Sequence, residues 1–133
     1  MPWQDGSSAQ VIFSAQADQD FRQVGGFGSR VFVRGKTNGR FELATNGSSG
    51  TFLGVLKTDP ATLGHGSIVA GGLTEVVAGG TVTLWDYVTA NTSGRAVAAG
   101  SGDLIMGQAF SAAADLEVLT IQVLKTLNAG GLL

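Results

Sequence analysis

Short runs in which apolar and polar residues alternate, each ended by Gly, Asn or Asp, follow one another along most of the chain. A period of two places alternate side chains on one face of a β-strand. The turn signals recur about every 8 to 12 residues, a spacing typical of small sandwiches and barrels. The runs expected to form strands or hairpins lie at residues 10–16, 30–45, 51–58, 67–73, 74–84, 86–90, 94–99, 104–110 and 116–124.

The segment RVFVRGKTNGRFELAT (30–45) has the pattern of a β-hairpin. Alternation directs Val31 and Val33 to one face and Phe32 to the other. We expect Gly35 to Gly39 to form the turn, because this stretch contains an Asn-Gly pair that tolerates the positive φ of tight turns.

One segment, FSAAADLEVLTIQVLKTL (110–127), has helical potential because Ala and Leu favour helices. In its second half Leu119, Ile121 and Val123 alternate with polar residues, so a strand is predicted there. The chain is therefore expected to be all-β, a small β-barrel or sandwich with an extended N-terminal arm.

The predicted organisation has three parts. Residues 1–10 are polar and rich in turn formers, and are expected to form the arm. Residues 11–53 are a hairpin-rich segment, and the more regular residues 54–133 are a compact β domain with a short C-terminal tail.

Composition limits the possible functions. Charged residues make up 14% of the chain, against roughly 25% in an average soluble domain, which suggests that a partner or a second copy covers part of the surface. The net charge is −2 and no block of Lys or Arg occurs, which argues against tight nucleic-acid binding. Cys is absent, so disulfides and Cys-based metal sites are excluded.

The sequence contains no targeting or membrane signal that we can identify. The first ten residues lack the basic and apolar regions of a signal peptide. No apolar run approaches the roughly 18 residues needed for a membrane span. We expect a protein made in a cytoplasm that has no membrane partner.

Two local patterns imitate binding motifs without completing them. The GKT sequence at 35–37 ends like a phosphate-binding loop, but Arg30 stands where that loop has its first Gly, and a strand is expected to follow. Asp18 and Asp20 resemble the start of a calcium loop, but Arg22 occupies the fifth position. Neither a nucleotide site nor a calcium site is predicted.

The residues that could support catalysis do not form a recognisable set. His65 is the only histidine, and its place between two Gly suggests exposure to solvent or to an interface. Asp86 and Asp103 could form a carboxylate pair for hydrolysis, but each stands where a strand is expected to begin, and Asp favours turns. We predict no enzyme activity, no catalytic residues, no cofactor and no metal.

Trp85 and Tyr87 flank Asp86, and alternation along a strand would place both rings on one face. The two rings could belong to the core or to an aromatic patch at a subunit contact. The sequence leaves both possibilities open.

Residues 54–124 resemble the small head-decoration (capsid cement) proteins of tailed bacteriophages, which are sometimes catalogued as phage proteins of unknown function or as recombinases. The resemblance lies in the order of the segments GVLKT, VAGGLTEVVAGGTVT, DYVTANTSGRAV, IMGQAFSAAA and VLTIQVL. It covers just over half of the chain, and residues 1–53 show no comparable match. Because the phosphate-binding pattern fails at Arg30, the sequence does not support the recombinase label.

The resemblance implies a virion structural protein, made in the host cytoplasm, that sits on the outside of the expanded capsid, usually as a homotrimer. Family members bind the major capsid protein and stabilise contacts between its subunits, often with an N-terminal arm lying on the capsid. On this basis we predict capsid or subunit contacts at Met1, Pro2, Trp3, Gln4, Asp5, Trp85, Tyr87, Leu132 and Leu133.

Two rival functions remain. A ligand-binding β module, for example a carbohydrate-binding one on a virion or cell surface, would use exposed aromatic rings such as Trp3, Trp85 and Tyr87 as stacking platforms. A small hydrolase would need Asp86, Asp103 and His65 close together. The position of these side chains in the fold decides between the alternatives.

Overall fold

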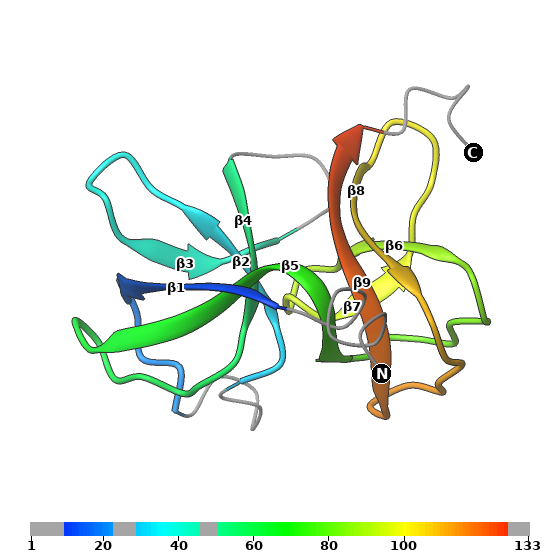
Figure 1. Cartoon of the computed structure of the whole chain (residues 1–133), viewed down its shortest axis with the longest axis horizontal. Coiled ribbons are helices and arrows are strands. Elements are labelled where there is room, and N and C mark those ends of the chain that lie inside the picture. Colours follow the sequence, from blue (N-terminus) through cyan, green and yellow to red (C-terminus); the bar gives the residue numbers. More distant parts are fainter. Residues whose placement is uncertain (1–9, 23–28, 46–50, 128–133) are drawn as a thin grey trace, which may run out of the picture.

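The computed structural model describes residues 10–22, 29–45 and 51–127, which contain nine β-strands and no helix (Figure 1). Their bounds are β1 Val11–Gln16, β2 Phe32–Gly35, β3 Phe41–Leu43, β4 Thr51–Leu56, β5 His65–Val77, β6 Tyr87–Ala90, β7 Ala96–Ala98, β8 Leu104–Ala109 and β9 Val118–Leu127. The prediction of an all-β fold is confirmed. No helix in the described ranges is long and apolar enough to cross a membrane.

The named strands pair antiparallel in one continuous sheet, in the order β3-β2-β4-β5-β9-β8-β6-β7, with β1 added on β5. The sheet ends at β3 and β7 and does not close on itself, so the barrel form of the prediction is wrong. Closure would require these two terminal strands to pair, and they do not. The fold is instead sandwich-like, because the turn before β7 returns to β2, where the Phe32 N–H donates to the Gly94 carbonyl (2.8 Å).

β5 is shared by both halves of the sheet. Its first part pairs with β1 and β4, and its second part pairs with β9. In the view of Figure 1, β1 to β4 lie to the left and β6 to β9 to the right, with β5 running between them. The sequence pattern predicts two separate runs here, 67–73 and 74–84. The structure corrects this: Gly72 has a φ of +86° and bends the strand without interrupting it.

Two hydrophobic clusters lie on opposite faces of the hairpin strands, as alternation predicted. Phe32 belongs to the larger cluster, which contains residues of both halves and includes an edge-on contact with Phe52 (ring centroids 5.7 Å). Val31 and Val33 belong to the smaller cluster. There Phe21 stacks on Phe41 with the ring centroids 5.3 Å apart, so the segment after β1 covers this face.

The remaining predictions concern the N-terminal arm, the C-terminal tail and the boundary between the two predicted β segments. The boundary placed between residues 53 and 54 falls inside β4, which pairs with β2 and with β5. Most of the arm (1–9) and the end of the tail (128–133) lie outside the described residues. β9 confirms the strand predicted in the second half of 110–127.

Among the described residues, the closest backbone approach to a glycine occurs where β4 pairs with β5. A Cβ on Gly54, whose φ is +152°, would lie 2.1 Å from the Val69 carbonyl oxygen, and backbone cannot move aside cheaply. We expect Gly54→Ala to lower the free energy of unfolding by about 3 kcal/mol, measured by urea titration. Gly35→Ala is the matched control, because its new Cβ would make an ordinary 3.5 Å contact with Leu53. Equal losses in the two variants would contradict this account.

Candidate interaction surface

Trp85 lies in the turn that precedes β6, not in the strand itself. In this turn, Thr83 to Asp86, the Asp86 N–H donates to the Thr83 carbonyl (3.1 Å), and the Asp86 carboxylate accepts from the Thr83 N–H (3.0 Å). Trp85 is the third residue and has a φ of +73°, the pattern of a type II turn. Alternation with Tyr87, the first residue of β6, therefore does not apply, and the inference that the two rings share a face loses its basis.

Backbone hydrogen bonds fix this turn against β8. The Trp85 N–H donates to the Ala109 carbonyl (2.9 Å), and the Ala109 N–H donates to the Asp86 carbonyl (2.7 Å). The side-chain amide of Gln108 also donates to the Trp85 carbonyl (3.2 Å). Both the N–H and the carbonyl of Trp85 are therefore hydrogen-bonded to β8, a strand that is itself paired with β6 and β9.

The indole ring projects into solvent. Trp85 is 56% exposed and meets the exposed ring of Phe110 edge-on, with the ring centroids 5.1 Å apart and the planes at 74°. Leu84 beside it is also exposed. Trp85 therefore does not belong to the core, and the other possibility that the sequence left open, an aromatic patch at a subunit contact, stays a prediction. We call Leu84, Trp85, Asp86 and Phe110 the Trp85 surface.

A shallow hollow lies beside the Trp85 surface. The chains on its two sides pair where the Val82 and Ala113 backbones exchange hydrogen bonds of 2.9 and 3.0 Å. Its lining includes Thr83, which belongs to the turn of Trp85, and Glu117, which belongs to the turn before β9. The two turns thus border one depression.

The same turn geometry occurs three times in this half of the molecule. In the turns 83–86, 100–103 and 114–117 the fourth residue is acidic, and its carboxylate accepts a 2.7–3.0 Å hydrogen bond from the first N–H. The third residue of each turn has a positive φ. The prediction that Asp86 and Asp103 are turn residues is confirmed, and Glu117 has the same role, which the sequence analysis missed.

The third position favours glycine, yet only one of these turns has it. Gly102 occupies the position in the turn 100–103, whereas Trp85 and Leu116 occupy it in the others, and both are more than half exposed. A side chain in this region costs about 1–2 kcal/mol. Such outliers concentrate at functional sites. An exposed, rigid Trp85 is therefore a candidate contact residue.

β1 provides a second exposed apolar surface. Val11, Ile12 and Phe13 are consecutive and all exposed, so no part of the described chain covers either face of the beginning of β1. The strand VIFSAQ contains neither charge nor Pro, the usual features that prevent an edge from pairing. The sequence pattern of residues 10–16 predicts the strand but does not indicate that it is exposed.

The contact residues predicted near the two ends are Met1, Pro2, Trp3, Gln4, Asp5, Leu132 and Leu133. All of them lie outside the described residues. The described part of the chain places only Trp85 and Tyr87 of the predicted set, and of these Tyr87 is partly buried.

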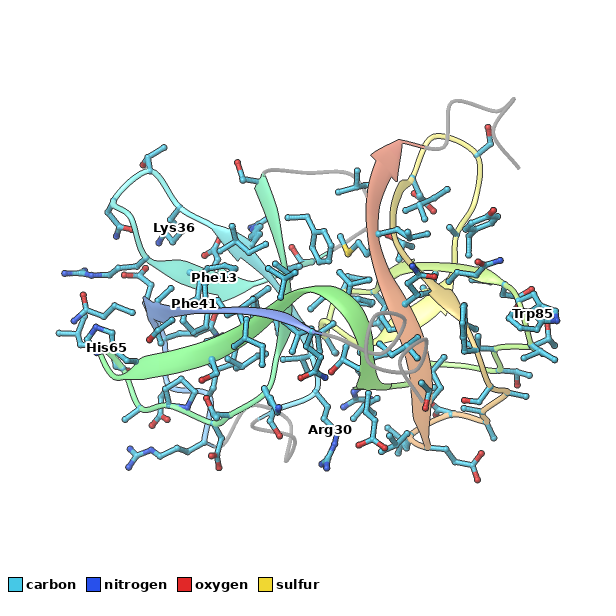
Figure 2. The ribbon with its side chains drawn as sticks, viewed as in Figure 1. Phe13, Arg30, Lys36, Phe41, His65 and Trp85 are labelled. Carbon is cyan, nitrogen blue, oxygen red and sulfur yellow. The ribbon has the colours of Figure 1, made fainter. Side chains whose placement is uncertain are left out.

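The hydrolase arrangement is not present. His65 is exposed at the start of β5, and Figure 2 shows it at the opposite end of the molecule from Trp85, the neighbour of Asp86. Within the described ranges, no three acidic or histidine side chains are grouped so that they could hold a metal ion.

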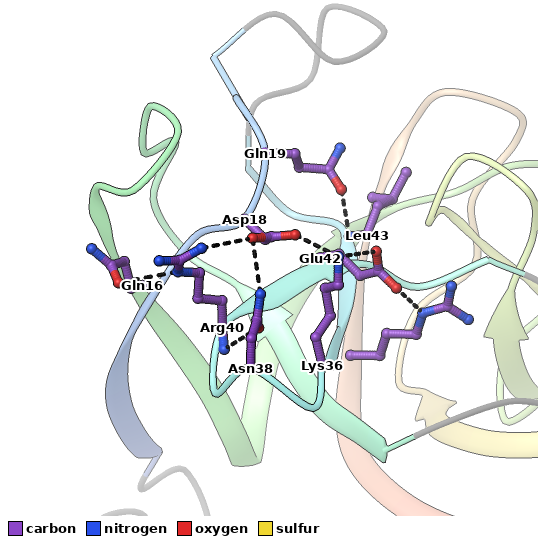
Figure 3. Close-up of polar contacts among 9 residues, drawn as sticks. Gln16, Asp18, Gln19, Lys36, Asn38, Arg40, Glu42 and Leu43 are labelled. Atoms are coloured by element: carbon purple, nitrogen blue, oxygen red, sulfur yellow. Dashed lines mark hydrogen bonds and ion pairs between the residues drawn. The ribbon is translucent and has the colours of Figure 1, made fainter.

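Residues 35–37, which end like a phosphate-binding loop, lead into the turn of the β2–β3 hairpin, and Lys36 is engaged in an ion-pair cluster (Figure 3). The Asp18 carboxylate accepts from Lys36 (2.5 Å), from Asn38 (3.3 Å) and from Arg40 (3.4 Å). Glu42 lies 2.8 Å from Arg34. Asp18, which resembles the first residue of a calcium loop only in sequence, therefore ties the hairpin to the segment after β1.

These contacts affect the titration of Asp18. The hydrogen bond from Lys36, followed by those from Arg40 and Asn38, holds the pKa of its carboxyl below the ordinary value of 3.8. Because the folded state favours the ionised form, Asp18 stabilises the fold above about pH 4, and this contribution is lost as the pH falls through the lowered pKa.

We expect the urea midpoint of unfolding to decrease as the pH is lowered from about 5 to about 2.5. The decrease should be smaller in Asp18→Asn. Lys36→Gln removes the largest cause of the lowered pKa and should reduce the pH dependence in the same direction. An Asp18→Asn variant that follows the pH profile of the parent protein would contradict this assignment.

The strain at Trp85 can be measured with a pair of variants. Trp85→Gly and Trp85→Ala both remove the ring, but only Ala retains the cost of a positive φ. We expect the Gly variant to be more stable by about 1 kcal/mol in thermal unfolding. The same pair at Tyr87, which lies in a strand, should show the opposite order, and an identical order at both positions would argue against strain.

Comparisons with known proteins identify a similar fold. No protein-family model matches the chain, and no curated protein matches it. Among solved structures, the chain is similar to the N base of the head fiber protein gp8.5 of bacteriophage phi29, with a TM-score of 0.63 and 17% sequence identity. The similarity covers 90% of this chain and 98% of that chain. At this identity the likeness concerns the fold, over nearly the whole of both chains.

Proposed function

We propose that this protein is a structural component of a phage head that binds the outer surface of the expanded capsid and stabilises contacts between major capsid subunits. The observation that carries the proposal is the fold shared with the base of a phage head fiber over almost the full length of both chains. The head-decoration resemblance of residues 54–124 has the same implication, and it comes from the sequence alone.

The exposed apolar surfaces support a binding function. Monomeric soluble proteins rarely leave clustered apolar side chains uncovered, and such patches mark interaction sites. Here the Trp85 surface and the start of β1 are both exposed, and they lie in different halves of the protein. A protein that holds neighbouring capsid subunits together needs more than one contact surface.

Binding alone is sufficient for this role. A protein that binds the assembled shell and not its separated subunits stabilises the shell by mass action. Contacts with several neighbours, or a homotrimer that contacts several sites, increase the effective affinity because each further contact forms at high effective concentration. The proposal therefore requires no catalysis and no cofactor.

The experiment is co-sedimentation of the purified protein with expanded, undecorated heads of its phage, beside unexpanded procapsids. We expect saturable binding to the expanded heads only, and a higher temperature of head disruption in the decorated sample. Binding to neither particle would overturn the proposal, and equal binding to both would remove its specificity for the expanded shell.

Carbohydrate binding is a second candidate, favoured by one observation. Trp85 is exposed rather than buried, as a stacking platform would require. A glycan array would test it, with Trp85→Gly as the control for any glycan that binds. Such a site would be consistent with a virion protein that contacts a cell surface rather than the capsid.

A further inference from the structure

The half of the molecule that carries the Trp85 surface is acidic. Across residues 70–127 the only Lys or Arg residues are Arg95 and Lys125, whereas five residues are acidic: Glu75, Asp86, Asp103, Asp115 and Glu117. Glu75 is paired with Arg30, a residue that precedes β2, at 3.4 Å. The other four carboxylates belong to the three turns described above or, for Asp115, stand within one of them.

Most basic side chains of the other half are paired with acidic side chains of the same half, whereas Lys57 donates to the neutral Gln10 side chain (3.2 Å). The ion pairs measure 2.5–3.4 Å and join Arg22 to Asp20, Arg34 to Glu42, Lys36 to Asp18 and Arg40 to Asp18. A second copy of this chain would therefore present cations whose charge is largely balanced. This favours a different protein as the partner of the acidic half.

One carboxylate belongs to the Trp85 surface, and a second lies in the hollow that adjoins its turn. Asp86 follows Trp85 directly, and Glu117 lines the adjoining hollow together with Thr83. Each accepts a hydrogen bond from a backbone N–H, which fixes its position. A carboxylate offers about four acceptor positions, so capacity remains for a cation from a partner.

The indole of Trp85 is suited to the same ligand. Trp gives the strongest cation–π interaction of the aromatic side chains. Its backbone is held by the hydrogen bonds to Ala109 and Gln108, so little conformational freedom is lost on binding. The apolar surface of Leu84 and Phe110 would contact the aliphatic part of a Lys or Arg side chain.

We infer that the Trp85 surface binds a basic protein surface, with a Lys or Arg of the partner stacked on the indole of Trp85 and paired with Asp86, and a further cation of the same partner surface paired with Glu117 across the adjoining hollow. This inference rests on the proposed function, in which the partner is the capsid, and adds the chemistry by which the capsid is recognised. It also requires the contact to weaken with salt, because the paired charges lie near solvent.

The test measures the binding of variants to expanded heads. Binding is measured by co-sedimentation at about 0.05 M and about 0.5 M NaCl. Trp85→Gly should weaken binding about tenfold. The double variant Asp86→Asn/Glu117→Gln removes both charges but keeps an acceptor oxygen for each turn. It should weaken binding about fivefold at low salt and reduce the dependence on salt.

Two matched controls separate the Trp85 surface from general effects. Leu63→Gly changes another exposed, large residue with a positive φ (+66°), and this one lies in the β4–β5 loop, at the His65 end of the molecule. Asp103→Asn makes the same isosteric change in the third acidic turn. Both should bind within about twofold of the parent protein. Thermal unfolding of every variant confirms that it is folded.

A second measurement does not depend on phage heads. The chain contains two Trp, so Trp3→Phe leaves Trp85 as the only indole fluorophore. We expect titration with an oligoarginine peptide to change this fluorescence in a saturable way, and titration with an oligoglutamate peptide to leave it unchanged. Asp86→Asn/Glu117→Gln in the same background should abolish the response.

The outcomes distinguish the inference from the proposed function. If Trp85→Gly binds heads as well as the parent protein does, the inference is overturned and the proposed function still stands. If Trp85→Gly loses binding but neither salt nor the double variant has an effect, the partner surface is apolar, and the inference is overturned. If an oligosaccharide competes for binding, the ligand is a glycan, and the inference is likewise overturned. A fluorescence response without head binding would support the recognition chemistry and overturn the capsid function.

Discussion

The backbone of β5 supplies the hydrogen bonds on which both halves of the sheet are built. Ile68 and Val69 are neighbours on this strand, both fully buried, and they point into the smaller and the larger cluster respectively. Beyond the bend at Gly72 the strand continues along β9, which carries β8, and β8 in turn carries the turn of Trp85. The position of the exposed indole therefore depends on a series of paired backbones that begins at β5. A change in the register of β5 would displace every later element.

Local pattern was sufficient for much of this fold, because its strands are short and half-buried. Alternation placed Val31 and Val33 opposite Phe32, and an Asn-Gly pair indicated the hairpin turn. Two features could not be obtained in this way. Whether β3 and β7 meet is decided by strand order over the whole chain, so local pattern cannot distinguish a barrel from an open sheet. Gly71-Gly72 resembles a strand end in sequence, and only the partners on both sides, β1 and β9, keep β5 continuous there.

The candidate surface was predictable in part. Asp86 and Asp103 were expected in turns because their carboxylates accept from nearby backbone N–H groups, which is a local interaction. The conformation of Trp85 was not expected, because a bulky residue at positive φ contradicts local preference and is maintained by contacts with Ala109 and Gln108, which lie more than 20 residues away. The turn at Glu117 was missed because the run 116–124 was assigned as a whole to a strand, whereas β9 begins only at Val118.

The long interval between the partner strands of the central ladder affects how the chain is made. Forty residues separate the end of β5 at Val77 from the start of β9 at Val118. At a synthesis rate of roughly 5–20 residues per second, the second half of β5 waits about 2 to 8 seconds on the ribosome before its partner emerges. During that time an apolar strand is available for wrong pairing between nascent chains. The carboxylates of the intervening turns give the incomplete chain a negative charge, and mutual repulsion of such chains opposes their aggregation until β9 completes the sheet.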